Sequence, residues 1–346
     1  MIMMLLVVTL LFTVSCGEKF DSDFDFAVIK TTGQKNKSFI TYYDANMNEV
    51  YTQKLNYGGM TDNFELPIVQ NRVVYMSPEG LATEADLCRT LGLDLKTGEV
   101  KEYRYNDEQI GITSTTVNSK ATYVCSNLNG VSWLARSDKE NKKIIDRSFK
   151  ENLLWSVIAD EDNIYGFANN DDDQLYIYEF NADTLETINK KNLKITGDMD
   201  SSMIYKGNIY FNVAVEGEEN GDKFGKYNIK SKTISWIEIP GEMPISDIFE
   251  YKDKIYVIHN DSVISEGNDI TIFDPATGEQ ELIKFEHPVV QVEIKNDIIY
   301  TIDDTTLYKY ELKGNKVKLI DSKEVYARDG NSLIFYYLGS FFLNDK

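Results

Sequence analysis

The stretch 289–321, VVQVEIKNDIIYTIDDTTLYKYELKGNKVKLID, contains four short runs that are separated by polar turns. Apolar and polar residues alternate within the runs, and Val, Ile and Tyr are frequent, as in pleated and half-buried strands. We expect an inner strand over 289–294, a second over 297–303, a third over 306–312 and an outer strand over 316–321. The stretch therefore predicts one small antiparallel sheet.

Part of this unit recurs along the chain as a turn residue, one or two apolar residues and a tyrosine. Successive tyrosines of the motif are 48, 42, 45, 46 and 44 residues apart. That period is typical of a four-stranded unit of about 40–50 residues. The tyrosines are Tyr75, Tyr123, Tyr165, Tyr210, Tyr256 and Tyr300.

A second motif, a polar turn that opens with an acidic or amide residue, keeps phase with the first. It is clearest in Asp94-Leu-Lys-Thr-Gly-Glu and Asp274-Pro-Ala-Thr-Gly-Glu. Asp can bind its own backbone in such a turn, and Gly supplies the positive φ that closes a hairpin. The motif predicts seven outer hairpins, which begin at Asp44, Asp94, Asp138, Asn181, Asn228, Asp274 and Glu311.

Together the two motifs predict an all-β chain that folds as a β-propeller of four-stranded blades. A β-sandwich lacks an in-phase period of this length, and a β-helix repeats over shorter windows. We expect a single propeller domain over 24–346, closed by N- and C-terminal strands. If the two ends form one composite blade there are seven blades, and if each end forms its own there are eight. The expected end strands are 26–29, 39–44, 49–55, 325–328, 333–338 and 341–343.

The repeated Asp-x-x-Thr-Gly-Glu resembles the repeats of bacterial YVTN and PQQ-type propeller proteins. The resemblance covers roughly residues 24–344 and implies a fold far more than an activity. Quinone-dependent members carry a Trp-rich repeat signature, whereas this chain has only Trp133, Trp155 and Trp236, at positions that are not equivalent. The resemblance therefore does not imply a quinone cofactor.

The N-terminus predicts export. Residues 1–14 are almost entirely apolar but too few to span a bilayer, which needs about 20 residues, so 1–15 are expected to be a signal peptide. The end of this run, Thr13-Val14-Ser15-Cys16-Gly17, resembles the bacterial lipobox, which implies lipidation of Cys16. Residues 16–23 would then be a lipidated tether that holds an extracytoplasmic domain on the bacterial cell membrane. An ordinary cleaved signal without a role for Cys16 is the alternative.

Two further cysteines, Cys88 and Cys125, fall in neighbouring repeats. An exported protein can keep a disulfide, and buried thiols are the alternative, so pairing stays open at this point.

The charge balance is acidic, with 36 Lys+Arg against 56 Asp+Glu. A net charge of −20 argues against a nucleic-acid partner, because phosphate binding needs a basic face. The acidic residues concentrate in the expected loops between second and third strands, which share one face of a propeller. Two of these loops, 77–88 and 215–223, are longer than a hairpin needs, and long loops on a rigid scaffold often carry binding. The sequence thus predicts an acidic recognition face, built from Glu79, Glu84, Asp86, Asp171, Asp172, Asp173, Glu216, Glu218, Glu219, Asp222, Asp261, Glu266 and Asp269.

Evidence for catalysis is scarce in the sequence. The two histidines, His259 and His287, have no metal-ligand spacing, and no Gly-x-Ser-x-Gly elbow occurs. We therefore expect no catalytic residues and a non-enzymatic binding or scaffold module for a protein, peptide or cell-envelope ligand. A structural member of an envelope assembly is a related reading. The alternative is a Ca²⁺-dependent propeller enzyme of the lactonase or glycan-lyase type. Its loop carboxylates, as in 169–173, would bind Ca²⁺, although EF-hand spacing is absent and solvated acidic turns would look the same.

Overall fold

The computed structural model describes residues 20, 22–60, 65–78, 87–215, 223–241, 243–261, 264, 266–314, 316–325, 327–328 and 335–344. The expected signal peptide and Cys16 lie outside these residues, as do Glu79, Glu84, Asp86, Glu216, Glu218, Glu219 and Asp222. Among the described residues, no helix has the length and apolar character needed to span a membrane.

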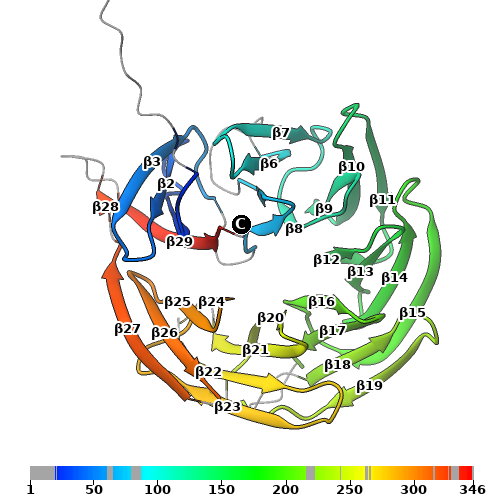
Figure 1. Ribbon diagram of the computed structural model, residues 1–346. Helices are drawn as coiled ribbons and strands as arrows, with labels where there is room; N and C mark the ends of the chain where they lie inside the picture. Colours follow the sequence, from blue (N-terminus) through cyan, green and yellow to red (C-terminus); the bar gives the residue numbers. More distant parts are fainter. Residues whose placement is uncertain are drawn as a thin grey trace, which may run out of the picture.

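The described residues form seven antiparallel sheets arranged as blades around a central axis (Figure 1). Blades 2–7 each use four consecutive strands, of which the first is innermost and the last lies on the rim. Blade 2 contains β4 (Ile68–Gln70), β5 (Val73–Met76), β6 (Arg89–Asp94) and β7 (Val100–Arg104), and blade 3 contains β8 (Ile112–Val117), β9 (Ala121–Leu128), β10 (Val131–Asp138) and β11 (Ile144–Phe149).

The next four blades repeat this order. Blade 4 contains β12 (Leu153–Ala159), β13 (Asn163–Asn169), β14 (Gln174–Asn181) and β15 (Thr187–Thr196), and blade 5 contains β16 (Ser202–Tyr205), β17 (Asn208–Val213), β18 (Lys223–Asn228) and β19 (Thr233–Ile237). Blade 6 contains β20 (Ile245–Tyr251), β21 (Lys254–Asp261), β22 (Glu266–Phe273) and β23 (Gln280–Lys284), and blade 7 contains β24 (Gln291–Lys295), β25 (Ile298–Ile302), β26 (Thr306–Lys313) and β27 (Lys316–Glu324).

Blade 1 joins the two ends of the chain, which confirms seven blades rather than eight. The C-terminal strand β29 (Phe335–Leu343) pairs with β1 (Phe26–Thr31), and β2 (Ser38–Tyr43) and β3 (Glu49–Leu55) complete the sheet. A short strand, β28 (Ala327–Arg328), pairs with the start of β29. The two separate strands expected over 333–338 and 341–343 are wrong. They form one strand, because Gly339 is accommodated as a β-bulge opposite the step from Ile29 to Lys30.

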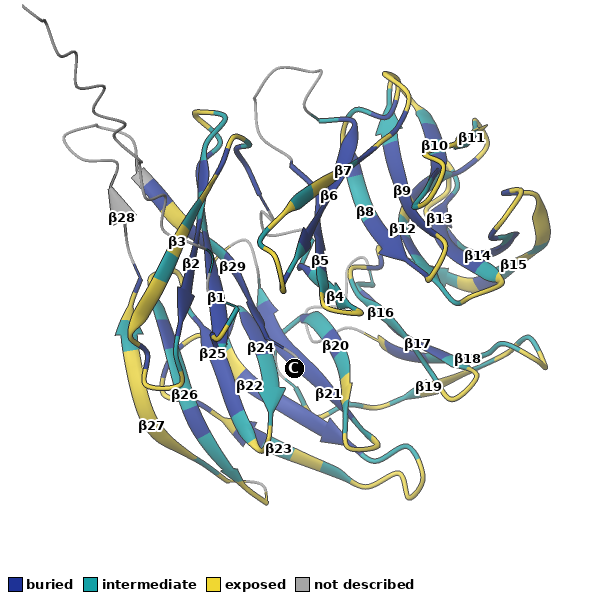
Figure 2. Ribbon diagram, turned by 45° about the horizontal axis from the view of Figure 1, so that its top comes forward, coloured by how far each residue is buried: buried dark blue, intermediate teal, exposed yellow. Residues whose placement is uncertain are grey.

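The tyrosine motif lies in the second strand of blades 2–7, and each of its six tyrosines is at most 4% exposed. The core consists of side chains packed between neighbouring blades. In the cluster between blades 3 and 4, for example, Tyr123 and Leu134 pack with Leu154 and Phe180. Figure 2 shows buried residues concentrated in the middle strands and exposed residues on rim strands such as β27. The sequence period therefore reflects packing of one blade on the next.

The polar turns between third and outer strands form as predicted. In each of two blades the Asp94 or Asp274 carboxylate accepts two backbone N–H bonds from its own turn, at 2.8–3.2 Å. These amides, from Ala276 and Thr277, hold the pKa of Asp274 below its ordinary value. Gly98 and Gly278 close the turns with φ of 74° and 80°. The equivalent position is also left-handed in three turns without glycine, at Lys142, Leu185 and Lys232, and Met47 is left-handed in a turn that is one residue shorter.

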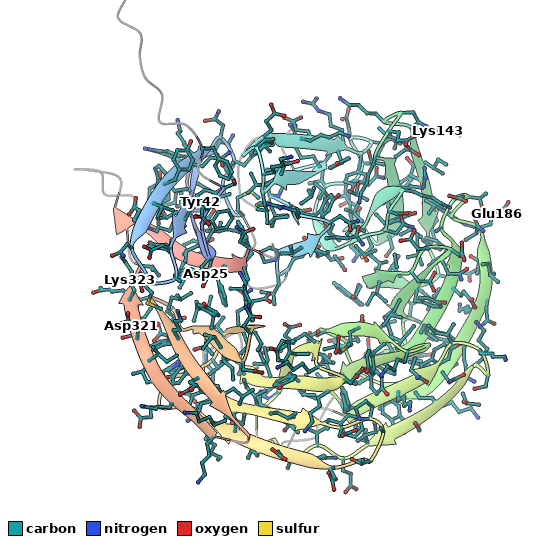
Figure 3. All side chains as sticks on the ribbon, viewed as in Figure 1. Asp25, Tyr42, Lys143, Glu186, Asp321 and Lys323 are labelled. Atoms are coloured by element: carbon teal, nitrogen blue, oxygen red, sulfur yellow. The ribbon has the colours of Figure 1, made fainter. Side chains whose placement is uncertain are left out.

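Charged side chains of these turns and of the rim strand β27 surround the ring. Figure 3 shows Lys143, Glu186 and Asp321 at the outer edge of the molecule, far from the axis. Lys323, also on β27, donates to the carbonyl of Met47 in blade 1 at 2.7 Å, which ties the last blade to the first at the rim.

Candidate functional site: the loop face and the axial cavity

Antiparallel pairing gives the propeller two different faces. In each of blades 2–7 the innermost strand begins at the end where the second strand finishes, so the loops between second and third strands surround the mouth of the axis. We call this side the loop face, and the opposite side, with the hairpins 71–72, 118–120, 160–162, 206–207, 252–253 and 296–297 and the polar outer turns, the turn face. Except for Asp269, the predicted acidic residues that the structure describes belong to loop-face segments.

The predicted acidic residues of the loop face are brought to one side of the molecule but not to one point. Asp171, Asp172 and Asp173 are exposed between β13 and β14 of blade 4. Asp261 and Glu266 flank the corresponding loop of blade 6. Blade 5 separates the two groups. In the described ranges, no group of three or more His, Cys, Asp or Glu is arranged to hold a metal ion.

Asp269 does not contribute to the acidic surface. It lies within β22, is 4% exposed and stands opposite His259 and Lys284 in the strand register. Its expected place in the loop is therefore wrong, because β22 begins as early as Glu266 and carries this position into the sheet.

Large apolar side chains are exposed on the same face. Trp155 is 37% exposed at the start of β12, and Ile264 is 56% exposed in the loop between β21 and β22. Tyr337, near the start of β29, is also 37% exposed and stands opposite Thr31, the last residue of β1. Tyr and Trp are enriched in protein interfaces, whereas singly exposed apolar residues are common on any surface. What distinguishes these three is that they accompany exposed carboxylates around one opening.

A cavity of about 320 Å³ lies on the axis behind this face. Apart from Asn260 at the end of β21, its lining comes from the innermost strand of every blade or the segment just before it, which the sequence did not predict. The lining residues are Glu65, Leu66, Ile68, Ser114, Thr115, Thr116, Ser156, Val157, Ile158, Asp200, Ser201, Ser202, Ser246, Asp247, Asn260, Val290, Gln291 and Gly339.

Several hydroxyls of this lining are structural, because they link one blade to the next. Ser114 Oγ accepts the backbone N–H of Val157 at 3.1 Å, and Thr116 Oγ1 accepts that of Ala159 at 3.1 Å. Thr115 is joined to Ser77 of blade 2 through their hydroxyls at 2.9 Å. These side chains satisfy strand edges that face the axis and could not pair with another strand.

Three carboxylates of the lining come from different blades or connections. Asp247 Oδ1 accepts from Ser201 Oγ at 3.0 Å and from the backbone N–H of Ile248 at 2.8 Å. Burial raises the pKa of Asp247. Asp200 accepts from Asn212 Nδ2 at 3.2 Å. Glu65 precedes β4, and both of its carboxylate oxygens are buried without a hydrogen-bond partner among the described residues.

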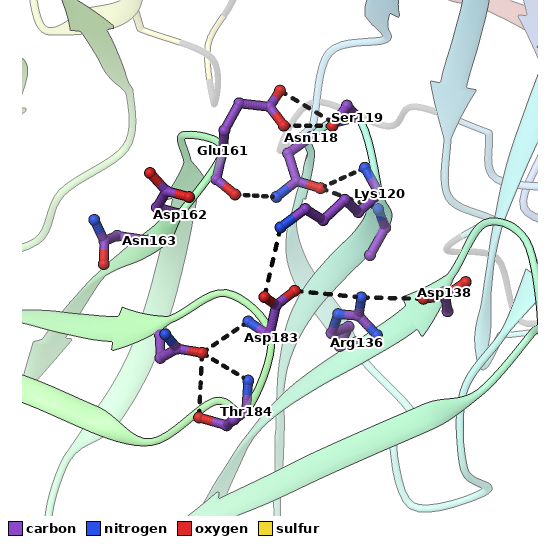
Figure 4. A network of polar contacts seen from close by, with 12 residues as sticks. Asn118, Ser119, Lys120, Arg136, Asp138, Glu161, Asp162, Asn163, Asp183 and Thr184 are labelled. Carbon is purple, nitrogen blue, oxygen red and sulfur yellow. Dashed lines mark hydrogen bonds and ion pairs between the residues drawn. The ribbon is translucent and has the colours of Figure 1, made fainter.

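The turn face differs from the loop face in that several of its charges are paired between blades. Lys206 and Lys252 form ion pairs with Asp253 and Asp297 of the following blades, at 2.6 and 2.5 Å. Figure 4 shows the equivalent region of blades 3 and 4, where Lys120 of one blade contacts Asp183 of the other at 3.5 Å. Exposed pairs of this kind contribute little stability each, but they leave this face with fewer unpaired charges.

The remaining chemistry-bearing side chains are buried in the sheets. Cys88 and Cys125 are buried thiols that are not joined to each other, and burial raises the pKa of Cys125 to about 12. His259 Nε2 is 2.8 Å from Thr271 Oγ1, and His287 stacks on Tyr308 with ring centroids 3.6 Å apart. Both histidines therefore have structural surroundings.

The geometry defines the chain as a seven-bladed β-propeller. Solved structures with the same fold include BamB from Moraxella catarrhalis, at 11% identity over 89% of both chains with a TM-score of 0.50. A chain of the mitotic checkpoint complex matches at 11% identity over 78% of this chain and 80% of the other, with a TM-score of 0.57. The dihydro-heme d1 dehydrogenase NirN in complex with DHE matches at 11% identity over 90% and 65%, with a TM-score of 0.55.

No protein-family model matches the chain, and the comparison with curated proteins finds no match. At 11% identity the structural matches show the fold alone. They confirm the propeller that the resemblance to YVTN and PQQ-type repeats implied.

Proposed function

We propose that this propeller is an exported, lipid-anchored module that binds a protein or peptide partner of the cell envelope through its loop face. Catalysis is not part of the proposal. The observation that carries it is the contrast between the two faces. The loop face presents exposed carboxylates and exposed Trp155, Ile264 and Tyr337 around a cavity, whereas many charges of the turn face are paired. The match with a chain of the mitotic checkpoint complex supports a scaffold role only in the sense that this fold occurs in an assembly.

The place where the chain enters the propeller supports an outward-directed loop face. Phe26, the first residue of β1, pairs with Tyr43, which directly precedes the turn at Asp44. The entry point is therefore on the turn face. Phe20 packs edge-to-face on Tyr42 and Tyr51, with ring centroids 5.2 and 5.6 Å apart.

A lipid on Cys16 would consequently hold the turn face close to the membrane. Only residues 16–19 would separate the lipid from Phe20, and four extended residues reach at most about 14 Å. In this arrangement the acidic loops point away from the lipid surface, which suits the strong net negative charge.

The proposal is tested by cross-linking the tagged protein in intact cells and identifying what is captured by the wild type and by two charge-matched variants. D171N/D172N/D173N removes three loop-face carboxylates, and E140Q/E186Q/E279Q removes three exposed carboxylates from outer turns. We expect a captured protein to be lost from the first variant and kept by the second. Equal capture by both variants, or loss only from the second, would contradict the proposal.

A further inference from the structure

The axial cavity contains buried polar atoms that the protein itself does not satisfy. Asn260, at the end of the second strand of blade 6, is 2% exposed, and its Oδ1 has no hydrogen-bond partner in the described structure. Its backbone N–H and Nδ2 do have partners, the carbonyls of Pro244 and Gly267. The hydroxyl of Ser246 is likewise buried and unpartnered, as are both carboxylate oxygens of Glu65. Buried polar groups are normally satisfied, so each exception needs an explanation.

A β-bulge directs two of the polar residues of blade 6 into the cavity. Ile245 stands opposite His259 and Asp247 opposite Ile258, which leaves Ser246 as the extra residue of β20. In a regular strand consecutive side chains point to opposite faces, but here both Ser246 and Asp247 line the cavity. Bulges occur frequently at functional sites because they redirect side chains in this way.

The character of the unsatisfied atoms indicates the kind of ligand. Asn260 Oδ1 and the Glu65 carboxylate accept hydrogen bonds, and a hydroxyl can accept as well as donate. The cavity lining adds the carboxylates of Asp200 and Asp247, and no Lys, Arg or His occurs among the described residues that form it. A buried carboxylate without a countercharge is costly, so the complementary ligand is a cation that donates several hydrogen bonds.

Size and geometry favour an organic cation. The carboxylates are too dispersed for a metal, since no described cluster of three such groups could hold one. No aromatic side chain lines the cavity in the described part, so a sugar would find no stacking surface. A volume of about 320 Å³ is at the lower end of pockets for small molecules, which measure about 300–1,000 Å³.

We propose that the axial cavity binds a ligand with a primary alkylammonium group, for which Glu65 before blade 2 and Asn260 and Ser246 of blade 6 supply hydrogen-bond acceptors on different sides of the cavity. The group is either part of a free amine or the lysine side chain of a polypeptide, and the inference holds for both sources. It goes beyond the partner proposed above, because a free amine needs no contact with the acidic loops.

Isothermal titration calorimetry of the purified protein with 1,5-diaminopentane tests this directly. We expect saturable binding that weakens at least tenfold in Glu65→Gln and is unchanged in Glu279→Gln, which removes the same charge from an exposed outer turn. Ser246→Ala is a second variant, and it removes a hydroxyl that makes no hydrogen bond in the described structure. It should bind a few-fold more weakly while keeping the wild-type unfolding midpoint.

Comparing a lysine peptide with the diamine distinguishes the two sources of the alkylammonium group. If the peptide acetyl-Gly-Lys-Gly-amide binds more tightly than the diamine, the group is a polypeptide lysine, and the reverse order indicates a free amine. The same peptide acetylated on its lysine should not bind. The inference is overturned if neither amine binds, if Glu65→Gln and wild type bind equally, or if Ca²⁺ alone binds. Loss of partner capture by D171N/D172N/D173N with unchanged amine binding would leave the inference intact, so the two proposals fail separately.

Discussion

Gln291 of β24 binds the backbone of Phe341 in β29 with both ends of its side-chain amide. Its Nε2 donates to the Phe341 carbonyl at 2.8 Å, and its Oε1 accepts the Phe341 N–H at 3.1 Å. Ser340 Oγ donates to the same Oε1 at 2.6 Å, and Gln291 and Ser340 are fully buried. One side chain of blade 7 thus satisfies the free edge of the strand that closes the ring.

Replacing Gln291 with leucine should therefore weaken closure. The variant keeps the volume roughly constant but leaves the buried N–H of Phe341 without a partner and its carbonyl with only the 3.4 Å contact from Ser340 Oγ. Each unsatisfied buried group costs about 1–3 kcal/mol, so we predict a loss of about 3 kcal/mol in the free energy of unfolding. Denaturant unfolding measures it.

Gln280→Leu is the matched control for this change. Gln280 Nε2 also donates to a backbone carbonyl, that of Glu238 at 2.7 Å, but the bond is exposed to solvent. Water can replace the lost partner, so we expect a loss below about 1 kcal/mol. Similar losses in both variants would mean that the Gln291 bonds do not support closure.

The parts of the fold that could be predicted from sequence are those that repeat locally. The tyrosine motif and the turns at Asp94 and Asp274 recur at a nearly fixed period because every blade solves the same packing problem. The single strand β29 could not be foreseen, because the bulge at Gly339 interrupts the apolar pattern without ending the strand.

The axial cavity was missed for a different reason. Glu65, Asp247 and Asn260 belong to different blades or different strands, and no spacing in the sequence connects them. The bulge at Ser246 also breaks the alternation that would show which residues face inward. The acidic loops could be predicted as a common face because topology alone places them there.

The left-handed residues of the outer turns offer a stability test. Lys142 has φ of 57° and is exposed, and it occupies the position that Gly278 fills in another blade. An L-residue in this conformation is strained by about 1–2 kcal/mol, whereas glycine is not, although glycine gains entropy on unfolding. We predict that Lys142→Gly leaves the free energy of unfolding unchanged or raises it by up to about 1 kcal/mol.

Gly278→Ala is the converse change at the equivalent position. No heavy atom lies within 4 Å of an added Cβ, so only backbone strain is introduced. We predict a loss of about 1 kcal/mol in thermal or denaturant unfolding. A stabilised Gly278→Ala, or a strongly destabilised Lys142→Gly, would contradict this reading of the turn.

Glu65 should make stability depend on pH near neutrality. Burial raises its pKa to about 7, because the low-dielectric surroundings disfavour the charged carboxylate. The folded protein therefore binds the proton of the Glu65 carboxyl group more tightly than the unfolded chain does. This tighter proton binding stabilises the folded protein fully below about pH 4.5. The stabilisation, about 3 kcal/mol, is lost as the pH rises through about 7.

Glu65→Gln cannot titrate, so it isolates this contribution from that of Asp247, which shares the cavity and whose pKa burial also raises. The difference in unfolding free energy between wild type and variant should shift in favour of the variant between pH 5 and pH 8. A difference that is constant over this range would show that Glu65 is not held as a buried acid.

Membrane attachment should depend on Cys16 alone among the three cysteines. Cys16→Ser should move the protein from the membrane fraction to the soluble extract, and it should abolish incorporation of labelled fatty acid. Cys88→Ser, at a buried thiol, should leave both unchanged. Retention of Cys16→Ser in the membrane fraction would refute lipid anchoring at this residue.

Partner binding by the loop face is tested most directly by site-specific photocross-linking in living cells. A photoreactive amino acid at Ile264, which is 56% exposed on the loop face, is compared with one at Thr277, which is exposed in an outer turn of the same blade. We predict a discrete protein adduct from position 264 and none from position 277. Adducts from position 277 alone, or no protein adduct from position 264, would contradict the proposed function.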